Sequence, residues 1–265
     1  MTLPRIWLIG AGNMGGAMLR RWIASGAVDA ASVTVLDPGT PPVPDGVRVA
    51  ARVPQEPAPD LLILAVKPQL LDAVAPSLAD VRPAVLVSIL AGVEEAALAA
   101  RIPAGAIVRA MPNLPVGIGK GVVALHAGRG SDAARSATEA LMAPLGLVEW
   151  IETEDQFDAV TALSGCGPGF VYRFIDALAG AGVALGLPSE QAARLARATV
   201  EGAALLAAGA DEPPAKLADR VASPGGSTRE GLNVLDHEDA LAVLMRDTLA
   251  ASARRNAEMA AAARG

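Results

Sequence analysis

The chain has 265 residues, of which 52% are hydrophobic, and its formal net charge is −6. Its mean hydropathy of +0.39 is high, but the most apolar runs, 61–66 and 83–93, fall far short of the roughly 20 residues of a membrane-spanning helix. The mixed-sign, net acidic charge argues against nucleic acid or a polybasic membrane surface as partner. With one cysteine, Cys166, and two histidines, the chain has no disulfide framework and no ligand set for a metal. We therefore expect a cytoplasmic protein without a bound metal.

In the first half, short β-branched or leucine-rich runs alternate with helical stretches. Strands are predicted at Arg5–Ile9, Val33–Leu36, Leu61–Val66, Ala84–Ile89, Ala106–Ala110, Gly121–Leu125 and Leu147–Trp150. Helices are predicted between them at Asn13–Ser25, Gln69–Leu78, Glu94–Ala100 and Ser131–Ala143. This order is typical of βαβ units. It predicts an α/β fold class, with a Rossmann-type doubly wound parallel sheet in a domain over residues 1–152 and a surface connection at Pro38–Pro59.

In the second half, helical Ala/Leu periodicity replaces the strand pattern. Helices are predicted at Asp155–Leu163, Gly169–Leu185, Ser189–Ala208, Pro214–Ala222, Thr228–Leu235 and Glu238–Ala263. The breaks between them carry helix start and stop signals, such as Gly186 followed by Pro188. We therefore predict a second, all-helical domain over residues 153–265. Long helices of this kind favour packing between subunits, so we expect a homodimer through the C-terminal helices, with further assembly left open.

The first motif is Gly10-Ala11-Gly12-Asn13-Met14-Gly15, which follows a predicted strand and begins a predicted helix. In such a turn Gly10 permits the tight bend, Gly12 lets the backbone approach a pyrophosphate, and Gly15 lets helix and strand pack. The helix N-terminus offers unpaired N–H groups to the anion. Because the βαβ order surrounds it, the motif predicts dinucleotide binding by Gly10, Ala11, Gly12, Asn13, Met14 and Gly15. A glycine turn without a ligand is the alternative.

Asp37 ends the second predicted strand, about 20 residues beyond the glycine motif. There an acidic side chain accepts hydrogen bonds from the adenosine ribose and repels a 2′-phosphate, which favours NADH. Arg48 and Arg52 are close in sequence and could pair with that phosphate. The expected cofactor is therefore NADPH or NADH, with Asp37 favouring NADH. In the alternative interpretation, Asp37 only caps the turn at residues 38–39.

Two further polar residues follow predicted strands. Lys67 comes directly after an apolar strand, and Asn113 lies in a proline-stiffened loop after another. Ligands of a parallel sheet collect at this end of its strands, so both residues are candidates for the cofactor site. Lys67 could equally be a lysine that just reaches solvent.

The most informative stretch is Ser223-Pro224-Gly225-Gly226-Ser227-Thr228, ahead of a predicted helix. Two glycines and then two hydroxyl residues direct N–H groups and hydroxyls to one point, which suits a small carboxylate. The candidate substrate-binding residues are Ser223, Gly225, Gly226, Ser227 and Thr228. A plain helix N-cap is the alternative.

Together these motifs resemble the pyrroline-5-carboxylate reductases over nearly the whole chain. The matching segments are Ile9–Gly15, Ala65–Gln69, Met111–Val116, Leu163–Pro168 and Ser223–Leu232, the last being the most specific. The resemblance implies an NAD(P)H-dependent oxidoreductase. It would transfer a hydride to the C=N bond of 1-pyrroline-5-carboxylate and give L-proline, the last step of proline biosynthesis.

The resemblance also implies roles for individual residues. The turn at Ser223 and 226–228 would hold the substrate carboxylate, and Thr228, the catalytic residue, would hydrogen-bond the ring nitrogen. The nicotinamide side of the cofactor would be lined by Ala65, Val66, Lys67, Pro68, Ser88 and Ala91. Arg52 stands where the family commonly has an asparagine that contacts the cofactor, and Asp37 stands where many members have serine or threonine.

Two other functions remain as alternatives. A related imine or 3-hydroxyacid oxidoreductase shares this domain order, but a hydroxyacid enzyme needs a lysine on the helix after its glycine turn, and 164–175 contains none. A non-catalytic dinucleotide-binding regulator would keep the first glycine motif but has no use for the turn at 223–228. Cys166, without a base near it in sequence, is expected to be a packing residue.

Overall fold

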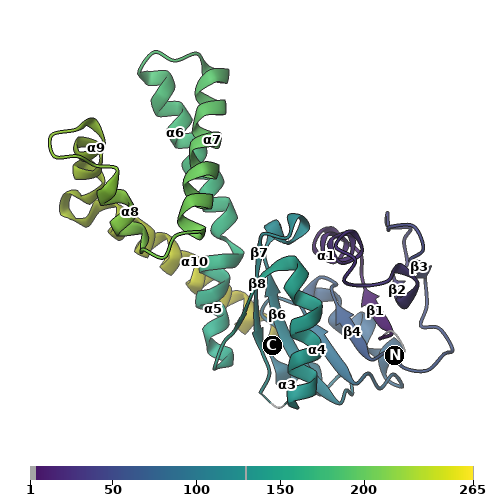
Figure 1. The fold of residues 1–265 in the computed structure, drawn as a ribbon. Coiled ribbons are helices and arrows are strands. Elements are labelled where there is room, and N and C mark those ends of the chain that lie inside the picture. The colour runs from purple at the N-terminus through teal and green to yellow at the C-terminus, as the bar shows by residue number, and fades with distance from the viewer. Residues whose placement is uncertain (1–3, 129, 265) are drawn as a thin grey trace. The chain divides into compact units, whose positions relative to one another are not determined.

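The structure is a computed structural model that describes residues 4–128 and 130–264, with side chains up to residue 261. It divides into two compact units: Met1–Cys166 with Ser252–Gly265, and Gly167–Ala251 (Figure 1). The first unit contains a sheet, and the second is helical. The domain boundary predicted after residue 152 follows a change of sequence pattern, and it stays a prediction.

The first unit is built on one eight-stranded sheet with the order β3-β2-β1-β4-β5-β6-β7-β8. Its strands are β1 Ile6–Ile9, β2 Val33–Leu36, β3 Arg48–Ala50, β4 Leu61–Leu64, β5 Val85–Ser88, β6 Ala106–Pro112, β7 Gly121–His126 and β8 Gly146–Trp150. The pairs from β3 to β6 are all parallel. Strand order reverses at β1, and in open α/β sheets ligands bind beyond the carboxyl ends of the strands at such a switch point. The predicted α/β class is confirmed.

Helices cover both faces of this sheet. They are α1 Asn13–Ala24, α2 Leu71–Val74, α3 Glu95–Ala99 and α4 Asp132–Met142. Successive side chains of a strand point to opposite faces: Ile6 and Leu8 join the core that includes residues of α1 and α4, whereas Trp7 and Ile9 join the core that includes residues of α2 and α3. Burial on both faces explains why the central strands are continuous apolar runs.

Two expectations for this unit are wrong. β7 runs antiparallel to β6, because the connection 113–120 holds only a 3₁₀ turn, Leu114–Ile118, and a parallel crossover needs about a dozen residues or more. The helix predicted at 69–78 is broken into 3₁₀ turns around the short α2, since Pro76 has no N–H to continue an α-helix.

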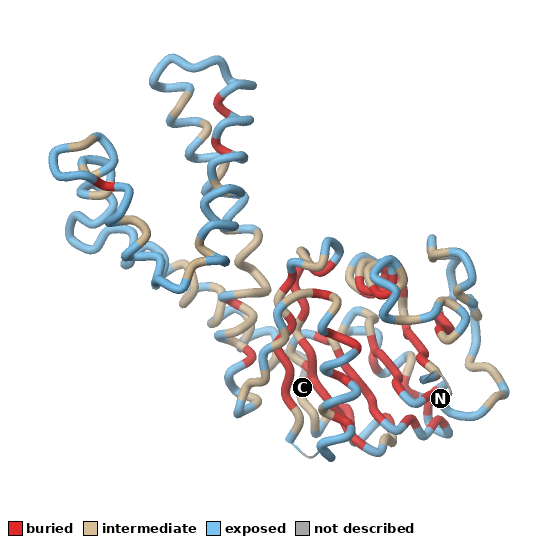
Figure 2. The backbone as a smooth tube through the Cα atoms, in the orientation of Figure 1, coloured by how far each residue is buried: buried red, intermediate tan, exposed pale blue. Residues whose placement is uncertain are grey.

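The second unit is made of α6 Gly167–Ala184, α7 Ser189–Ala208, α8 Pro214–Arg220, α9 Ser227–Asp236, the 3₁₀ turn His237–Asp239 and the first half of α10 Ala240–Arg264. Within 167–251, all of which is described, the buried residues are Ala192, Ala196 and Ala222 (Figure 2). Large hydrophobic side chains lie exposed in this unit instead, among them Leu206 of α7 and Leu185 just after α6. Among the residues described, no helix is long and apolar enough to cross a membrane.

Candidate active site

The glycine motif forms the turn between β1 and α1. Gly10 has φ +90°, and a Cβ added there would lie 3.1 Å from the Ala65 carbonyl oxygen. A Cβ on Gly15 would lie 2.4 Å from the Gly10 carbonyl oxygen, whereas one on Gly12 would meet nothing within 4 Å. No side chain caps the start of α1. The turn is therefore closed on its protein side by Gly10 and Gly15, and it is open at Gly12, where a ligand can approach.

Asp37 follows β2 and is half-buried. Its Oδ1 accepts the N–H of Gly39 at 2.9 Å, and its Oδ2 accepts the N–H of Ala11 at 3.1 Å. The carboxylate therefore caps its own turn and also holds the glycine turn of the neighbouring strand. The turn cap predicted as one interpretation is present. The residue also stands at the carboxyl ends of the strands, and its contact with a ribose stays a prediction.

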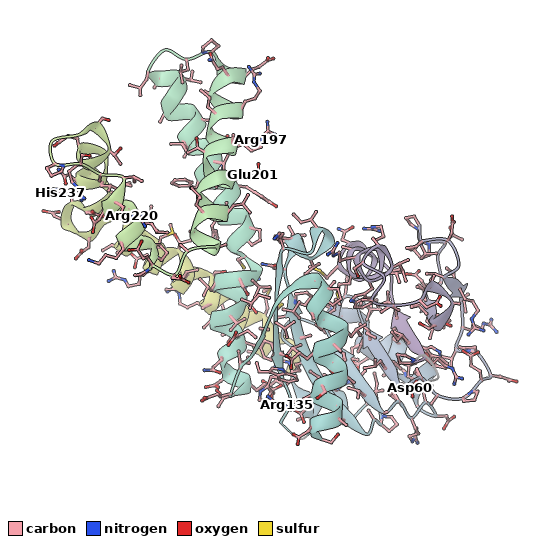
Figure 3. All side chains as sticks on the ribbon, in the orientation of Figure 1. Asp60, Arg135, Arg197, Glu201, Arg220 and His237 are labelled. Atoms are coloured by element: carbon pink, nitrogen blue, oxygen red, sulfur yellow. The ribbon has the colours of Figure 1, made fainter. Side chains whose placement is uncertain are left out.

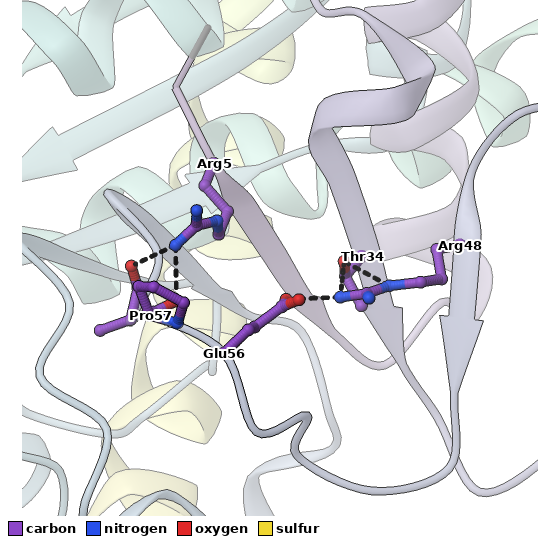
Figure 4. A network of polar contacts seen from close by, with 6 residues as sticks. Arg5, Thr34, Arg48, Glu56 and Pro57 are labelled. Atoms are coloured by element: carbon purple, nitrogen blue, oxygen red, sulfur yellow. Dashed lines mark hydrogen bonds and ion pairs between the residues drawn. The ribbon is translucent and has the colours of Figure 1, made fainter. Parts of the chain in front are cut away.

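Of the two arginines considered for a 2′-phosphate, Arg48 lies at the opposite edge of the sheet from the predicted cofactor site. It starts β3 in register with Thr34, at the amino end of the strands, and its guanidinium donates to Thr34 Oγ1 and pairs with Glu56 (Figure 4). β3 itself lies in a segment predicted to be only a connection, because a three-residue, mostly exposed edge strand has no apolar pattern. Arg52 follows β3 at the carboxyl side and is exposed.

The next two strands also end at this edge. Ala65, Val66 and Pro68 are partly buried after β4, and Lys67 between them is exposed. Ser88, the last residue of β5, is 2% exposed, and its Oγ accepts the N–H of Leu90 at 3.3 Å. Ala91 is exposed in the loop that follows. The structure thus brings the candidates from β1, β2, β4 and β5 together on one edge.

Asn113 is buried at the end of β6. Its Oδ1 accepts the N–H of Val122 at 2.8 Å, and its Nδ2 donates to the Ser164 carbonyl oxygen at 2.9 Å. Ser164 lies in a π-helical turn, Thr161–Gly165, that follows α5 Phe157–Val160. The amide therefore joins two loops of the first unit, and half of its hydrogen-bonding capacity is used within the protein.

The turn before α9 has the composition of a type II turn, with proline second and glycine third. Gly226 N–H donates to the Ser223 carbonyl oxygen at 2.9 Å, and Gly225 has φ +71°. Gly226 is the N-cap of α9, and no side chain caps the helix. The plain helix N-cap named as the alternative is thus present at Gly226, without a side-chain cap, and ligand binding at this turn stays a prediction. The first N–H groups of α9 have no partner within the helix.

A neighbouring ion pair supports this turn. Arg229 Nη2 donates to Asp219 Oδ1 at 2.9 Å and to the Ala222 carbonyl oxygen at 3.4 Å, which ties α9 to α8. The hydrogen bond and charge of Arg229 lower the pKa of the Asp219 carboxyl. Sequence reasoning missed this pair, because the two residues belong to different helices.

Neither histidine lies at this turn. His237 follows the opposite end of α9 (Figure 3). His126 ends β7 in the first unit. In the part of the chain that is described, no group of three or more His, Cys, Asp and Glu could hold a metal ion.

A doubly wound sheet with an open glycine turn at its switch point, followed by a helical unit, defines a two-domain dinucleotide-dependent oxidoreductase. Residues 5–92 match the family model "NADP oxidoreductase coenzyme F420-dependent", and residues 154–259 match "Pyrroline-5-carboxylate reductase dimerisation". The chain belongs to the pyrroline-5-carboxylate reductase family, so the predicted resemblance is confirmed. As the motifs predict, it is an oxidoreductase that reduces pyrroline-5-carboxylate to proline.

Individual relatives match two thirds of the chain or more. The pyrroline-5-carboxylate reductase of Pseudomonas aeruginosa is 35% identical over 98% of both chains, and that of Synechocystis is 44% identical over 67% of both. A solved pyrroline-5-carboxylate reductase from Coxiella burnetii has a TM-score of 0.85 and 29% identity, and the match covers 97% of this chain and 98% of that one.

Proposed function

We propose that the nicotinamide cofactor, NADPH or NADH, lies across the carboxyl ends of β1, β2, β4 and β5. The observation that carries this proposal is the turn at Gly12, which is open to a ligand while Gly10 and Gly15 are closely packed. The residues fit a pyrophosphate there, since the start of α1 offers N–H groups without a side-chain cap. The contacts would come from Gly10 to Gly15, Asp37, Arg52, Ala65 to Pro68, Ser88 and Ala91. Asn113 would hold the loop after β6 in place.

The substrate is proposed to bind at the start of α9. Its carboxylate would accept the N–H groups that follow Gly226, and the partial positive charge of the helix N-terminus favours an anion there. Ser223 and Gly225 shape the turn, and Ser227 adds a hydroxyl. The Thr228 hydroxyl would hydrogen-bond the ring nitrogen of the imine. This arrangement fixes both ends of a small ring.

In this reaction the side chains orient the substrate and do not need to transfer a proton. When bound, the reduced nicotinamide supplies the hydride for the C=N carbon. A cyclic imine takes up a proton from water near neutral pH, so no histidine or carboxylic acid is needed to deliver one. The residues of the chain therefore act by orientation: Thr228 holds the nitrogen, and the α9 turn holds the carboxylate.

Asp37 is the basis of a prediction about the cofactor. Its carboxylate stands where a 2′-phosphate would lie and would repel it, so we expect a higher kcat/KM with NADH than with NADPH. Asp37→Asn keeps an oxygen that can accept the Gly39 or Ala11 N–H but removes the charge, and should raise the NADPH-to-NADH ratio of kcat/KM by about 10-fold. Equal or better use of NADPH by the unchanged enzyme would refute the preference, and Arg52 would then be the phosphate contact to test.

The second unit is proposed to be the homodimer interface. It buries three alanines and exposes large side chains on every long helix, Leu206 of α7 being 77% exposed. Leu185, just after α6, is 88% exposed. So much apolar surface on helices marks a protein interface. A second copy of the same helices would cover it, in keeping with the dimerisation family model matched by residues 154–259.

Light scattering tests the dimer. We expect a particle of at least twice the 26.7 kDa chain mass, and we expect Leu206→Glu to shift it toward the monomer because a charge buried in an apolar interface is costly. Leu147→Glu, at an exposed position of β8 in the first unit, is the matched control and should leave the mass unchanged. An active particle of single-chain mass would contradict the proposal.

A further inference from the structure

An ion pair between a buried arginine and a partly buried glutamate lies in the first unit, beside the loops assigned to the nicotinamide. Arg109, in β6, has a side chain only 7% exposed, and its Nη1 donates to Glu154 Oε1 at 2.7 Å. The guanidinium carbon lies 4.2 Å from the centre of the Phe157 ring. Charges buried this deeply need partners with good geometry. The Arg109 guanidinium has two such partners here, the Glu154 carboxylate and the Phe157 ring. Arg109 and Glu154 are 45 residues apart in the sequence.

Glu154 makes a second contact with the same oxygen. Its Oε1 also accepts the backbone N–H of Glu95 at 2.7 Å, at the first residue of α3. A carboxylate at this position is favoured by the helix dipole. Glu95 in turn accepts the N–H of Gly128, just after β7, at 2.7 Å through Oε2. One carboxylate therefore sets the start of α3 against β6, and Glu95 extends the connection to β7.

The loop between β5 and α3 is the segment held by these contacts. It runs from Ser88 through Ala91 to the start of α3, so its far end is fixed where Glu154 binds the Glu95 N–H. Gly92 has φ +73°, and a Cβ there would lie 3.3 Å from the Ala260 Cα in α10, which leaves the loop little room on that side. A cavity of about 1040 Å³ opens beside it, lined among others by Pro68, Ala91, Gly92, Arg109, Met111 and Glu154.

We propose that Glu154 and Arg109 are positioning residues that hold the β5–α3 loop in the position that contact with the nicotinamide requires. This inference rests on the proposed function, which places Ser88 and Ala91 along the nicotinamide. Neither residue touches the reacting atoms. A displacement of about 1 Å in a positioning element costs up to about 100-fold in rate, so loss of this anchor lowers hydride transfer more than it lowers binding of the dinucleotide.

The test compares Glu154→Ala, Glu154→Gln and the unchanged enzyme. Glu154→Ala removes the acceptor of the Glu95 N–H and should lower kcat by about 10- to 100-fold. Its affinity for ADP-ribose, or for the 2′-phosphorylated form if NADPH is preferred, should stay within about 2-fold, since these probes lack the nicotinamide. Glu154→Gln keeps an oxygen acceptor and should recover most of kcat. Glu56→Ala, which breaks the ion pair at the amino ends of the strands, is the matched control and should keep full activity.

Three results would overturn the proposal: an unchanged kcat in Glu154→Ala, an equal loss of ADP-ribose affinity, or no recovery in Glu154→Gln. Ala91→Val, measured beside them, separates this inference from the site on which it depends. If Ala91→Val slows transfer and Glu154→Ala does not, only the positioning role is wrong. If neither slows transfer, the nicotinamide does not lie at this loop, and both proposals fall.

Discussion

Gly12→Ala is expected to raise the KM for the nicotinamide cofactor by about 10- to 100-fold, as a methyl group does when it fills a binding position. A Cβ at this position meets no protein atom within 4 Å, so the added methyl would occupy only the space through which a pyrophosphate approaches the turn. The fold should therefore be unaffected. Steady-state kinetics give the KM, and a melting curve unchanged within about 1 °C shows the intact fold.

Gly15→Ala makes the same chemical change three residues later and should act on the fold instead. Its Cβ would lie 2.4 Å from the Gly10 carbonyl oxygen and 3.0 Å from the Ala65 Cβ, so backbone must move. Overpacking of this kind costs about 2–3 kcal/mol of unfolding free energy, and we expect Tm to fall by about 5–10 °C. A Gly15→Ala protein that melts like the unchanged one, or a Gly12→Ala protein that melts early, would contradict the geometry of the turn.

Thr228→Ala is expected to lower kcat for pyrroline-5-carboxylate by about 100-fold, the usual effect of removing one hydrogen bond to a reacting group. The KM for the cofactor should change little, because the proposed contact is to the ring nitrogen of the imine. Thr228→Ser keeps the hydroxyl and should keep most of the rate. Steady-state kinetics with pyrroline-5-carboxylate as the varied substrate measure both effects.

Thr248→Ala serves as the matched control for this loss. Thr248 also carries its hydroxyl on a helix, where Oγ1 donates to the Leu244 carbonyl oxygen at 2.8 Å, and its removal should leave the rate unchanged. If Thr228→Ala reduced pyrroline-5-carboxylate as fast as the unchanged enzyme, the contact with the imine nitrogen would be wrong and the α9 turn would bind the substrate by its carboxylate alone.

Features that depend on neighbours in sequence were predictable. Apolar runs place β1, β2, β4 and β5 within two residues at each end, and helix signals give α7 at its observed bounds. The glycine motif follows the same rule, because a tight turn between a strand and a helix needs its glycines at fixed spacing. The candidate residues at these strand ends therefore follow from the order of residues along the chain.

Features that depend on partners distant in sequence were not predictable. β3 is stabilised by pairing with β2 and by the contacts of Arg48, which donates to Thr34 and forms an ion pair with Glu56. Its three residues have no strand character of their own. Arg109 lies in a segment with clear strand character, but nothing in sequence joins it to Glu154. The two hydrogen bonds of Asp37 likewise depend on the fold, which places the N–H groups of Ala11 and Gly39 beside its carboxylate.

By itself, the sequence determined the α/β class, the helical second half, the family and the candidate residues, because periodicity, turn chemistry and motif spacing are local properties of the chain. The tertiary structure decided which candidates share an edge, that Arg48 belongs to the opposite edge, and that Glu154 anchors the loop after β5. The physical reason is that a buried charge or an open backbone N–H group is satisfied by whatever the fold brings within about 3 Å, and distance along the chain does not specify that neighbour.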